Sequence, residues 1–113
     1  MKTKTIKTPF GTYEVETTIH HKGKMFAECE KDCPKGWEIA TYELLQYLRN
    51  NHAKAFNLID TLEFVQNPDT ISRKKGNVAW FVAGSVVAFL NCSRNPDYSN
   101  SSLGVRFVRK VKK

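Results

Sequence analysis

The sequence has few of the features that identify enzymes or membrane proteins. Of its 113 residues, only three are cysteine and three are histidine. It contains no glycine-rich phosphate loop, no GxSxG motif and no HExxH motif. Its longest apolar stretch, residues 78–90, is interrupted by Gly84 and Ser85 and falls short of the ~18 residues that a membrane helix requires. The sequence therefore predicts neither a membrane-spanning helix nor a common nucleotide-binding or hydrolase site.

The cysteine pattern does not indicate a metal site. Three cysteines cannot all pair within one chain, and Cys29 and Cys33 are spaced one residue more widely than a zinc-binding CxxC. His20 and His21 lie nearby in the sequence without completing a standard ligand pattern. We expect no metal or other cofactor. Two arrangements of Cys29 and Cys33 remain open: packed free thiols, or a disulfide between the two that closes the loop. The basic N-terminus lacks the apolar segment of a secretory signal, so we expect a cytoplasmic or virion-associated protein.

Length and composition favour one compact domain over residues 1–113. A chain of this length is typical of a single domain, and no internal repeat or linker is apparent. A hydrophobic content of 41% is too high for a disordered tail. The 18 lysines and arginines against 11 aspartates and glutamates give a net charge of +7. Such charge can bind polyanions, or it can simply aid solubility.

Periodicity predicts an α+β fold. Residues 12–19 alternate as a strand with Glu14 and Glu16 on its wet face, 22–24 resemble a hairpin turn, and 25–29 a short strand. Thr41 is suited to cap a helix over 42–50, whereas 53–64 fit either a helix or a strand.

The second half of the chain has the pattern of strands. We expect strands over 78–83 and 85–90 that meet at Gly84, a polar loop over 91–102 and a closing strand over 103–111. Together the elements predict a small, mostly antiparallel sheet with one or two helices.

Two segments resemble a known superfamily. CPKGWEIATYELL, residues 33–45, and NCSRNPDYSNSSLGVRFVR, residues 91–109, are similar to segments of bacterial and phage domains with the C-type-lectin-like fold. That superfamily includes Fibrobacter-type paralogous proteins, Legionella collagen-like adhesins and formylglycine-generating enzymes. The resemblance implies a buried Trp37 before the helix and a close backbone approach at Gly104. It also places Arg106 and Arg109 at a rim or against a carboxylate.

The departures from this superfamily point away from its chemistry. Ala40 stands where members usually have proline, and residues 79–90 lack the cysteines that formylglycine-generating enzymes use. The loop over 91–102 offers only one carboxylate, Asp97, so we do not expect the calcium site of true C-type lectins. The sequence therefore favours a non-catalytic domain.

The leading functional hypothesis is recognition of a protein or glycan ligand through the polar loop. Asparagine, serine and tyrosine make adaptable contacts in binding loops, and an exposed tyrosine or arginine can anchor them. The expected ligand-binding residues are Arg94, Asn95, Asp97, Tyr98 and Asn100.

The alternative hypothesis is a nucleic-acid-associated factor of a phage or bacterium. Tyr47 or Trp80 would stack on bases in this case. The residues expected to contact phosphates are Arg73, Lys74, Lys75, Arg106 and Arg109. A small enzyme, with a histidine–cysteine pair assembled in space, is a third hypothesis.

Overall fold

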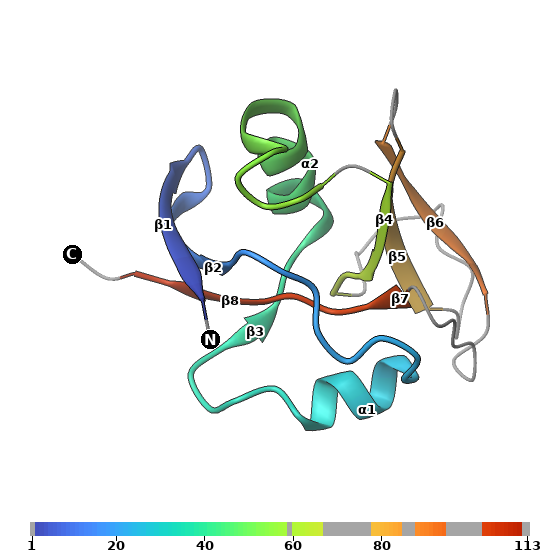
Figure 1. Cartoon of the computed structure of the whole chain (residues 1–113). Helices are drawn as coiled ribbons and strands as arrows, with labels where there is room; N and C mark the ends of the chain where they lie inside the picture. Colours follow the sequence, from blue (N-terminus) through green and yellow to red (C-terminus); the bar gives the residue numbers. More distant parts are fainter. Residues whose placement is uncertain (1, 59, 67–77, 85–87, 95–102, 112–113) are drawn as a thin grey trace.

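The computed structural model describes residues 2–58, 60–66, 78–84, 88–94 and 103–111 (Figure 1). Within these residues the chain forms two sheets and two helices. In chain order the elements are β1 (Thr3–Thr8), β2 (Gly11–Glu16), α1 (Phe26–Lys31), β3 (Glu38–Ile39), α2 (Tyr42–His52), β4 (Thr61–Phe64), β5 (Val78–Ala83), β6 (Ala88–Arg94), β7 (Leu103–Gly104) and β8 (Phe107–Lys110).

The strands are divided between two four-stranded sheets. The first has the order β1-β2-β8-β3 and is antiparallel throughout. The second has the order β6-β5-β4-β7, and only its β4–β7 pair is parallel. The predicted α+β class and the mostly antiparallel pairing are confirmed, but the strands form two sheets rather than one.

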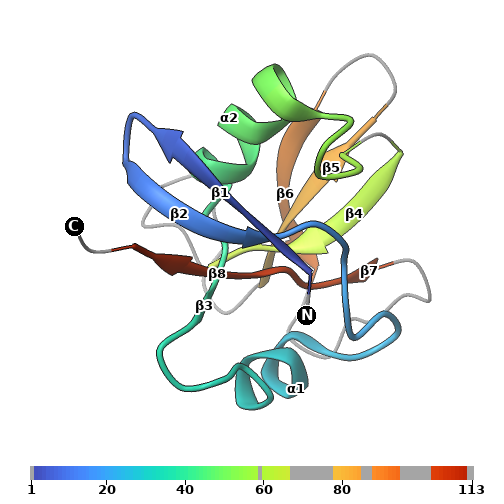
Figure 2. The same ribbon diagram turned by 60° about the vertical axis from the view of Figure 1, so that its left-hand side comes forward.

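Helix α2 fills the space between the two sheets (Figures 1 and 2). Leu44, Leu45 and Leu48 recur at helical spacing and are buried. They belong to a core cluster that takes residues from both sheets: Val15, Ala40, Leu44, Leu45, Leu48, Phe56, Leu58, Val65, Phe81, Ala83 and Val108. A second cluster lies against α1 and comprises Phe26, Cys29, Ile39, Phe64, Trp80, Leu103, Val105 and Phe107.

The closing segment joins the two sheets. Instead of one strand over 103–111, the chain pairs with β4 through β7 and then moves to the first sheet as β8. Both alternating faces are consequently buried from Leu103 to Val108. Val105 and Phe107 pack inward as expected, and Arg106 is buried as well.

The prediction for α2 is confirmed. The hydroxyl of Thr41 accepts a hydrogen bond from the Leu44 amide at 3.2 Å, and Glu43 lies in the first turn. The helix continues to His52, two residues beyond the predicted end. Fraying ends of this kind are the least predictable part of a helix.

The strand predicted over residues 25–29 is wrong, because this segment begins α1. The Met25 amide donates to the Glu28 carboxylate at 2.9 Å, which satisfies a donor at the start of the helix. Phe26 and Cys29, three positions apart, share the buried face. The turn at 22–24 is present, with Gly23 at a φ of 87°, but it leads into a helix rather than a hairpin.

Other predicted boundaries also changed. Residues 91–94 belong to β6 rather than to a loop, whereas 85–87 and 95–102 lie outside the described residues. The segment over 53–64 contains strand β4 at its end. Strand β1 was not predicted, because Ile6 is its one strongly apolar residue. Glu16, expected on a wet face, is buried and accepts a hydrogen bond from the Phe107 amide at 2.8 Å.

Candidate functional site

A groove with a volume of about 470 Å³ lies between α1 and β3, and we call it the α1–β3 groove. Figures 1 and 2 show that the chain leaves α1, loops round and returns into β3. The groove is lined by Phe26, Glu30, Cys33, Trp37, Glu38, Ile39 and Gln66. Its volume is within the range of about 300–1,000 Å³ that is typical of ligand sites.

Local sequence determines how these walls form. Phe26 and Glu30 are four residues apart on α1, so they lie on one face of the helix. Gly36 has a φ of 88°, a left-handed conformation that glycine adopts without strain. The Trp37 amide donates to the Pro34 carbonyl at 3.1 Å and closes the turn. The chain thereby returns along the helix and presents Trp37 to the groove.

The Trp37 wall is supported by a charged pair. The Arg109 guanidinium lies 4.7 Å from the centroid of the Trp37 ring and pairs with the Glu14 carboxylate. Glu14 also accepts a hydrogen bond from the Thr3 hydroxyl at 2.8 Å. The hydrogen bonds from Arg109 and Thr3 lower the pKa of Glu14 below its ordinary value. Trp37 is half-buried rather than buried as expected, and one of its contacts is the Arg109 cation.

Gln66 holds the Glu38 rim of the groove in place. Its side-chain amide donates to Glu38 Oε1 at 3.0 Å and to the Ile39 carbonyl at 2.6 Å. The backbone N–H of Gln66 also donates a hydrogen bond to the Ala40 carbonyl, at 3.0 Å. These bonds connect the end of β4 with β3 and fix the Glu38 carboxylate at the groove.

The thiols near the groove are not activated as nucleophiles. Burial raises the pKa of Cys33, and the carboxylates of Glu16, Glu38 and Glu30 act in the same direction. Burial likewise raises the pKa of Cys29 to about 11. Both cysteines are free, so Cys29 and Cys33 do not form the disulfide that the sequence left open. At neutral pH both thiols remain protonated, the form that is not nucleophilic.

Two further side-chain contacts involve buried carboxylates, Glu63 and Glu16. Arg106 Nε is 3.2 Å from Glu63 Oε1, and Arg106 Nη2 donates to the Phe56 carbonyl at 2.8 Å. His20 Nε2 is 2.6 Å from Glu16 Oε2. Burial raises the pKa of Glu63, whereas the Arg106 charge opposes this shift. The Arg106–Glu63 pair joins the closing segment to β4, and the His20–Glu16 contact joins the end of β2 to the residues that follow it, so both have a structural role.

The structure does not describe most of the predicted recognition loop. Arg94 is the last residue of β6, with its backbone opposite Val78. The other predicted ligand-binding residues, Asn95, Asp97, Tyr98 and Asn100, lie outside the described residues. Their assignment therefore stays a prediction.

Of the five predicted phosphate contacts, the structure describes Arg106 and Arg109. The expected phosphate contact of Arg106 is wrong, because its side chain is fully buried and paired with Glu63. Arg109 is exposed but is engaged by Glu14 and Trp37. Trp80 is buried and cannot stack on a base from solvent. The basic cluster of Arg73, Lys74 and Lys75 lies outside the described residues.

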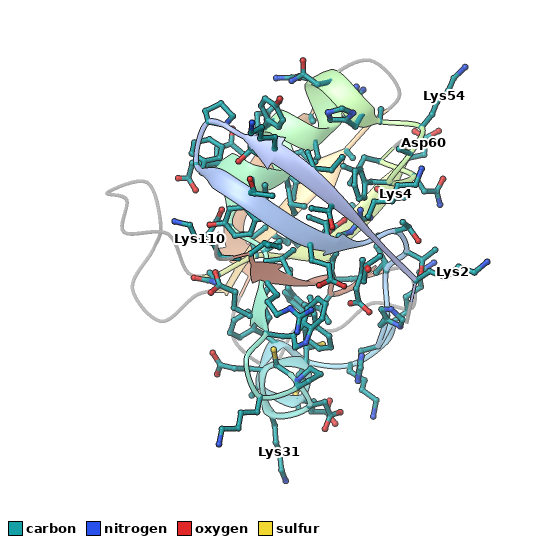
Figure 3. All side chains as sticks on the ribbon, turned by 90° about the vertical axis from the view of Figure 1, so that its left-hand side faces the viewer. Lys2, Lys4, Lys31, Lys54, Asp60 and Lys110 are labelled. Atoms are coloured by element: carbon teal, nitrogen blue, oxygen red, sulfur yellow. The ribbon has the colours of Figure 1, made fainter. Side chains whose placement is uncertain are left out.

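The described lysines labelled in Figure 3, Lys2, Lys4, Lys31, Lys54 and Lys110, do not all gather on one face. Figure 3 shows the labelled lysines directed to different sides of the molecule, with Lys110 opposite Lys2 and Lys4, Lys31 below and Lys54 above. The charge of these five lysines is therefore distributed over the surface rather than gathered in one patch.

Sequence reasoning did not predict the groove. It selected Trp37 and Cys33 for other reasons, but not Phe26, Glu30 or Gln66. The four-residue spacing of Phe26 and Glu30 was the available signal, and it was missed because residues 25–29 were predicted to be a strand that ends before Glu30. Gln66 carries no local signal, since it reaches the groove only through the pairing of two distant segments.

Comparisons of the chain with models of protein families, with curated proteins and with solved structures found no match. Among the described residues, no group of three histidine, cysteine, aspartate or glutamate side chains is arranged to hold a metal ion. No helix in the described part of the chain is long and apolar enough to cross a membrane.

Proposed function

We propose that this chain is a non-catalytic recognition domain of the C-type-lectin-like class that binds a partner protein. The α1–β3 groove is the observation that carries the proposal. It has an apolar floor of Phe26 and Ile39, a half-buried Trp37 and a few polar groups at its rim. Concave apolar sites with a few convergent polar groups are typical of binding sites.

The similarity of residues 33–45 to the C-type-lectin-like superfamily supports the class. This segment supplies Cys33, Trp37, Glu38 and Ile39 to the groove and Thr41 to the start of α2. A single stretch of sequence thus forms both the turn that shapes the groove and the helix behind it.

The chemistry of the groove supports binding rather than catalysis. None of the described lining residues is a histidine, serine or threonine, and the Cys33 thiol is held protonated. Glu30 and Glu38 are exposed, whereas a carboxylic acid that serves as a general acid is commonly held in an apolar pocket.

Selection from a displayed random-peptide library tests the proposal. Cys33→Phe fills the groove from its wall. Ala27→Phe is the matched control because Ala27 is exposed on α1, the helix beside the groove, and does not line the groove. We expect peptides that bind the wild type and A27F, and that bind C33F at least tenfold more weakly. Circular dichroism and thermal unfolding establish that all three proteins are folded.

Two results would overturn this proposal. One is a set of peptides that bind all three proteins equally and lose binding when Arg94 and Tyr98 are replaced by alanine, which would move recognition to the polar loop. The other is binding to a glycan array or to oligonucleotides by a protein that selects no peptide.

A further inference from the structure

Resting on the proposed function, we propose that the α1–β3 groove binds a basic segment of a partner protein, in which a lysine or arginine lies beside an apolar residue. The charge of the groove is opposite to that of the whole chain. Glu30 and Glu38 are both exposed at the groove, in a protein with a net charge of +7.

The two carboxylates are available to a ligand. Neither forms an ion pair with a lysine, arginine or histidine among the described residues. Among the described residues, the Glu38 carboxylate accepts a hydrogen bond from the neutral side chain of Gln66. This bond uses one of the two carboxylate oxygens. A partner cation at this rim would be attracted by two carboxylates on a chain whose net charge is positive.

The field of these carboxylates is felt inside the groove. Both Glu38 and Glu30 contribute to the raised pKa of Cys33, in addition to the larger effect of burial and the contribution of Glu16. The thiol faces the same cavity, so a ligand atom placed there experiences the same negative potential.

The apolar surface fits the remainder of a basic side chain. Lysine and arginine bury their aliphatic stems along apolar surface and keep the charged head in a polar environment. Phe26 and Ile39 provide the apolar floor, and Glu30 and Glu38 provide acceptors at the rim. The groove therefore offers both surfaces that one such side chain requires.

The Arg109 contact determines which part of the ligand meets Trp37. The Arg109 guanidinium already lies over the Trp37 ring and is fixed by Glu14. A second cation on this ring would be repelled by the first. We therefore assign the ligand cation to the carboxylate rim, and an apolar neighbour in the ligand to the Trp37 wall.

Titration of isotope-labelled protein with matched synthetic peptides tests the proposal. The probes are the pentapeptides Gly-Leu-Xaa-Leu-Gly, with arginine, lysine, glutamine or glutamate at the central position, and amide resonances are followed by nuclear magnetic resonance. We expect the arginine and lysine peptides to shift the amides of Glu30, Cys33 and Glu38. The glutamine and glutamate peptides should bind at least tenfold more weakly.

A pair of double variants isolates the role of the rim charges. Glu30→Gln with Glu38→Gln should weaken binding of the arginine peptide about tenfold. Glu43→Gln with Asp60→Asn changes the net charge equally at exposed positions outside the groove and should leave binding unchanged.

The outcomes separate this proposal from the proposed function. Equal binding of the arginine and glutamine peptides would overturn the charge selection and leave recognition by the groove intact. Selection of library peptides that bind in the groove but contain no basic residue would likewise overturn the charge selection and leave recognition by the groove intact. Failure of every peptide, synthetic or displayed, would overturn both proposals.

Discussion

Gly104 is the position where the fold has no room for a side chain. A Cβ atom at this residue would overlap the backbone carbonyl of His20 and the side chain of Ile19. The same place is held by two hydrogen bonds of 2.8 Å between the backbones of His20 and Val105. The closing segment therefore crosses between the sheets at a point where the backbones are already in contact.

We predict that Gly104→Ala lowers the free energy of unfolding by about 3 kcal/mol or more, because backbone atoms cannot move aside as a flexible side chain can. Urea unfolding followed by circular dichroism measures the change. Gly36→Ala is the control, since its Cβ meets open space and only its φ of 88° is unfavourable; it should cost about 1–2 kcal/mol. Equal costs for the two variants would contradict the prediction.

Glu63 predicts a dependence of stability on pH. Burial raises its pKa above the ordinary value of 4.5, so the folded protein binds this proton more tightly than the unfolded chain. Stability is then highest when Glu63 is protonated and falls as the pH rises from 4.5 through the raised pKa. Other groups also contribute to the total slope, which makes a comparison with a variant necessary.

Glu63→Gln removes this titration while keeping the shape of the side chain. We expect the two proteins to have similar free energies of unfolding in mild acid, and the variant to become the more stable one as the pH rises. Urea unfolding at a series of pH values measures the difference. If the wild type instead gains stability relative to the variant, the attraction of Arg106 outweighs the burial of the carboxylate.

At the scale of elements, Thr41 determines where α2 begins. Its side-chain oxygen accepts a hydrogen bond from an amide at the start of the helix, which otherwise has no partner within the helix. We predict that Thr41→Ala lowers the free energy of unfolding by about 1 kcal/mol, whereas Thr41→Ser keeps most of the stabilisation that the cap provides. Thermal or urea unfolding of the three proteins checks this, and an alanine variant as stable as the wild type would contradict it.

The elements differ in how well the sequence predicts them for a physical reason. Helix α2 combines a cap with three leucines at helical spacing, and both signals lie within a dozen residues. Helix α1 has six residues, too few to be stable alone, so its conformation depends on burying Phe26 and Cys29 against distant strands. The break between β7 and β8 depends on partners in two sheets, which no local pattern reports.

At the scale of the whole molecule, charge was the property that the sequence predicted least well. Counting residues gives +7 and suggests a basic surface. Folding buries Arg106, engages Arg109 with Glu14 and directs the labelled lysines to different sides. The exposed carboxylates of Glu30 and Glu38 meanwhile come together at one groove. The sign of the local potential thus depends on tertiary structure and can oppose the net charge.

The Cys33 thiol can report this local potential without any ligand. In a Cys92→Ser background, with Cys29 buried, we predict that a methanethiosulfonate with a trimethylammonium group modifies Cys33 faster than one with a sulfonate group. After division by the same ratio for a free cysteine peptide, the preference should be roughly three- to tenfold and should decrease with added salt. Replacing Glu30 and Glu38 with glutamine should remove most of it, whereas the exposed control pair, Glu43→Gln with Asp60→Asn, should not. A preference for the sulfonate would mean that the net charge of +7 also dominates inside the groove.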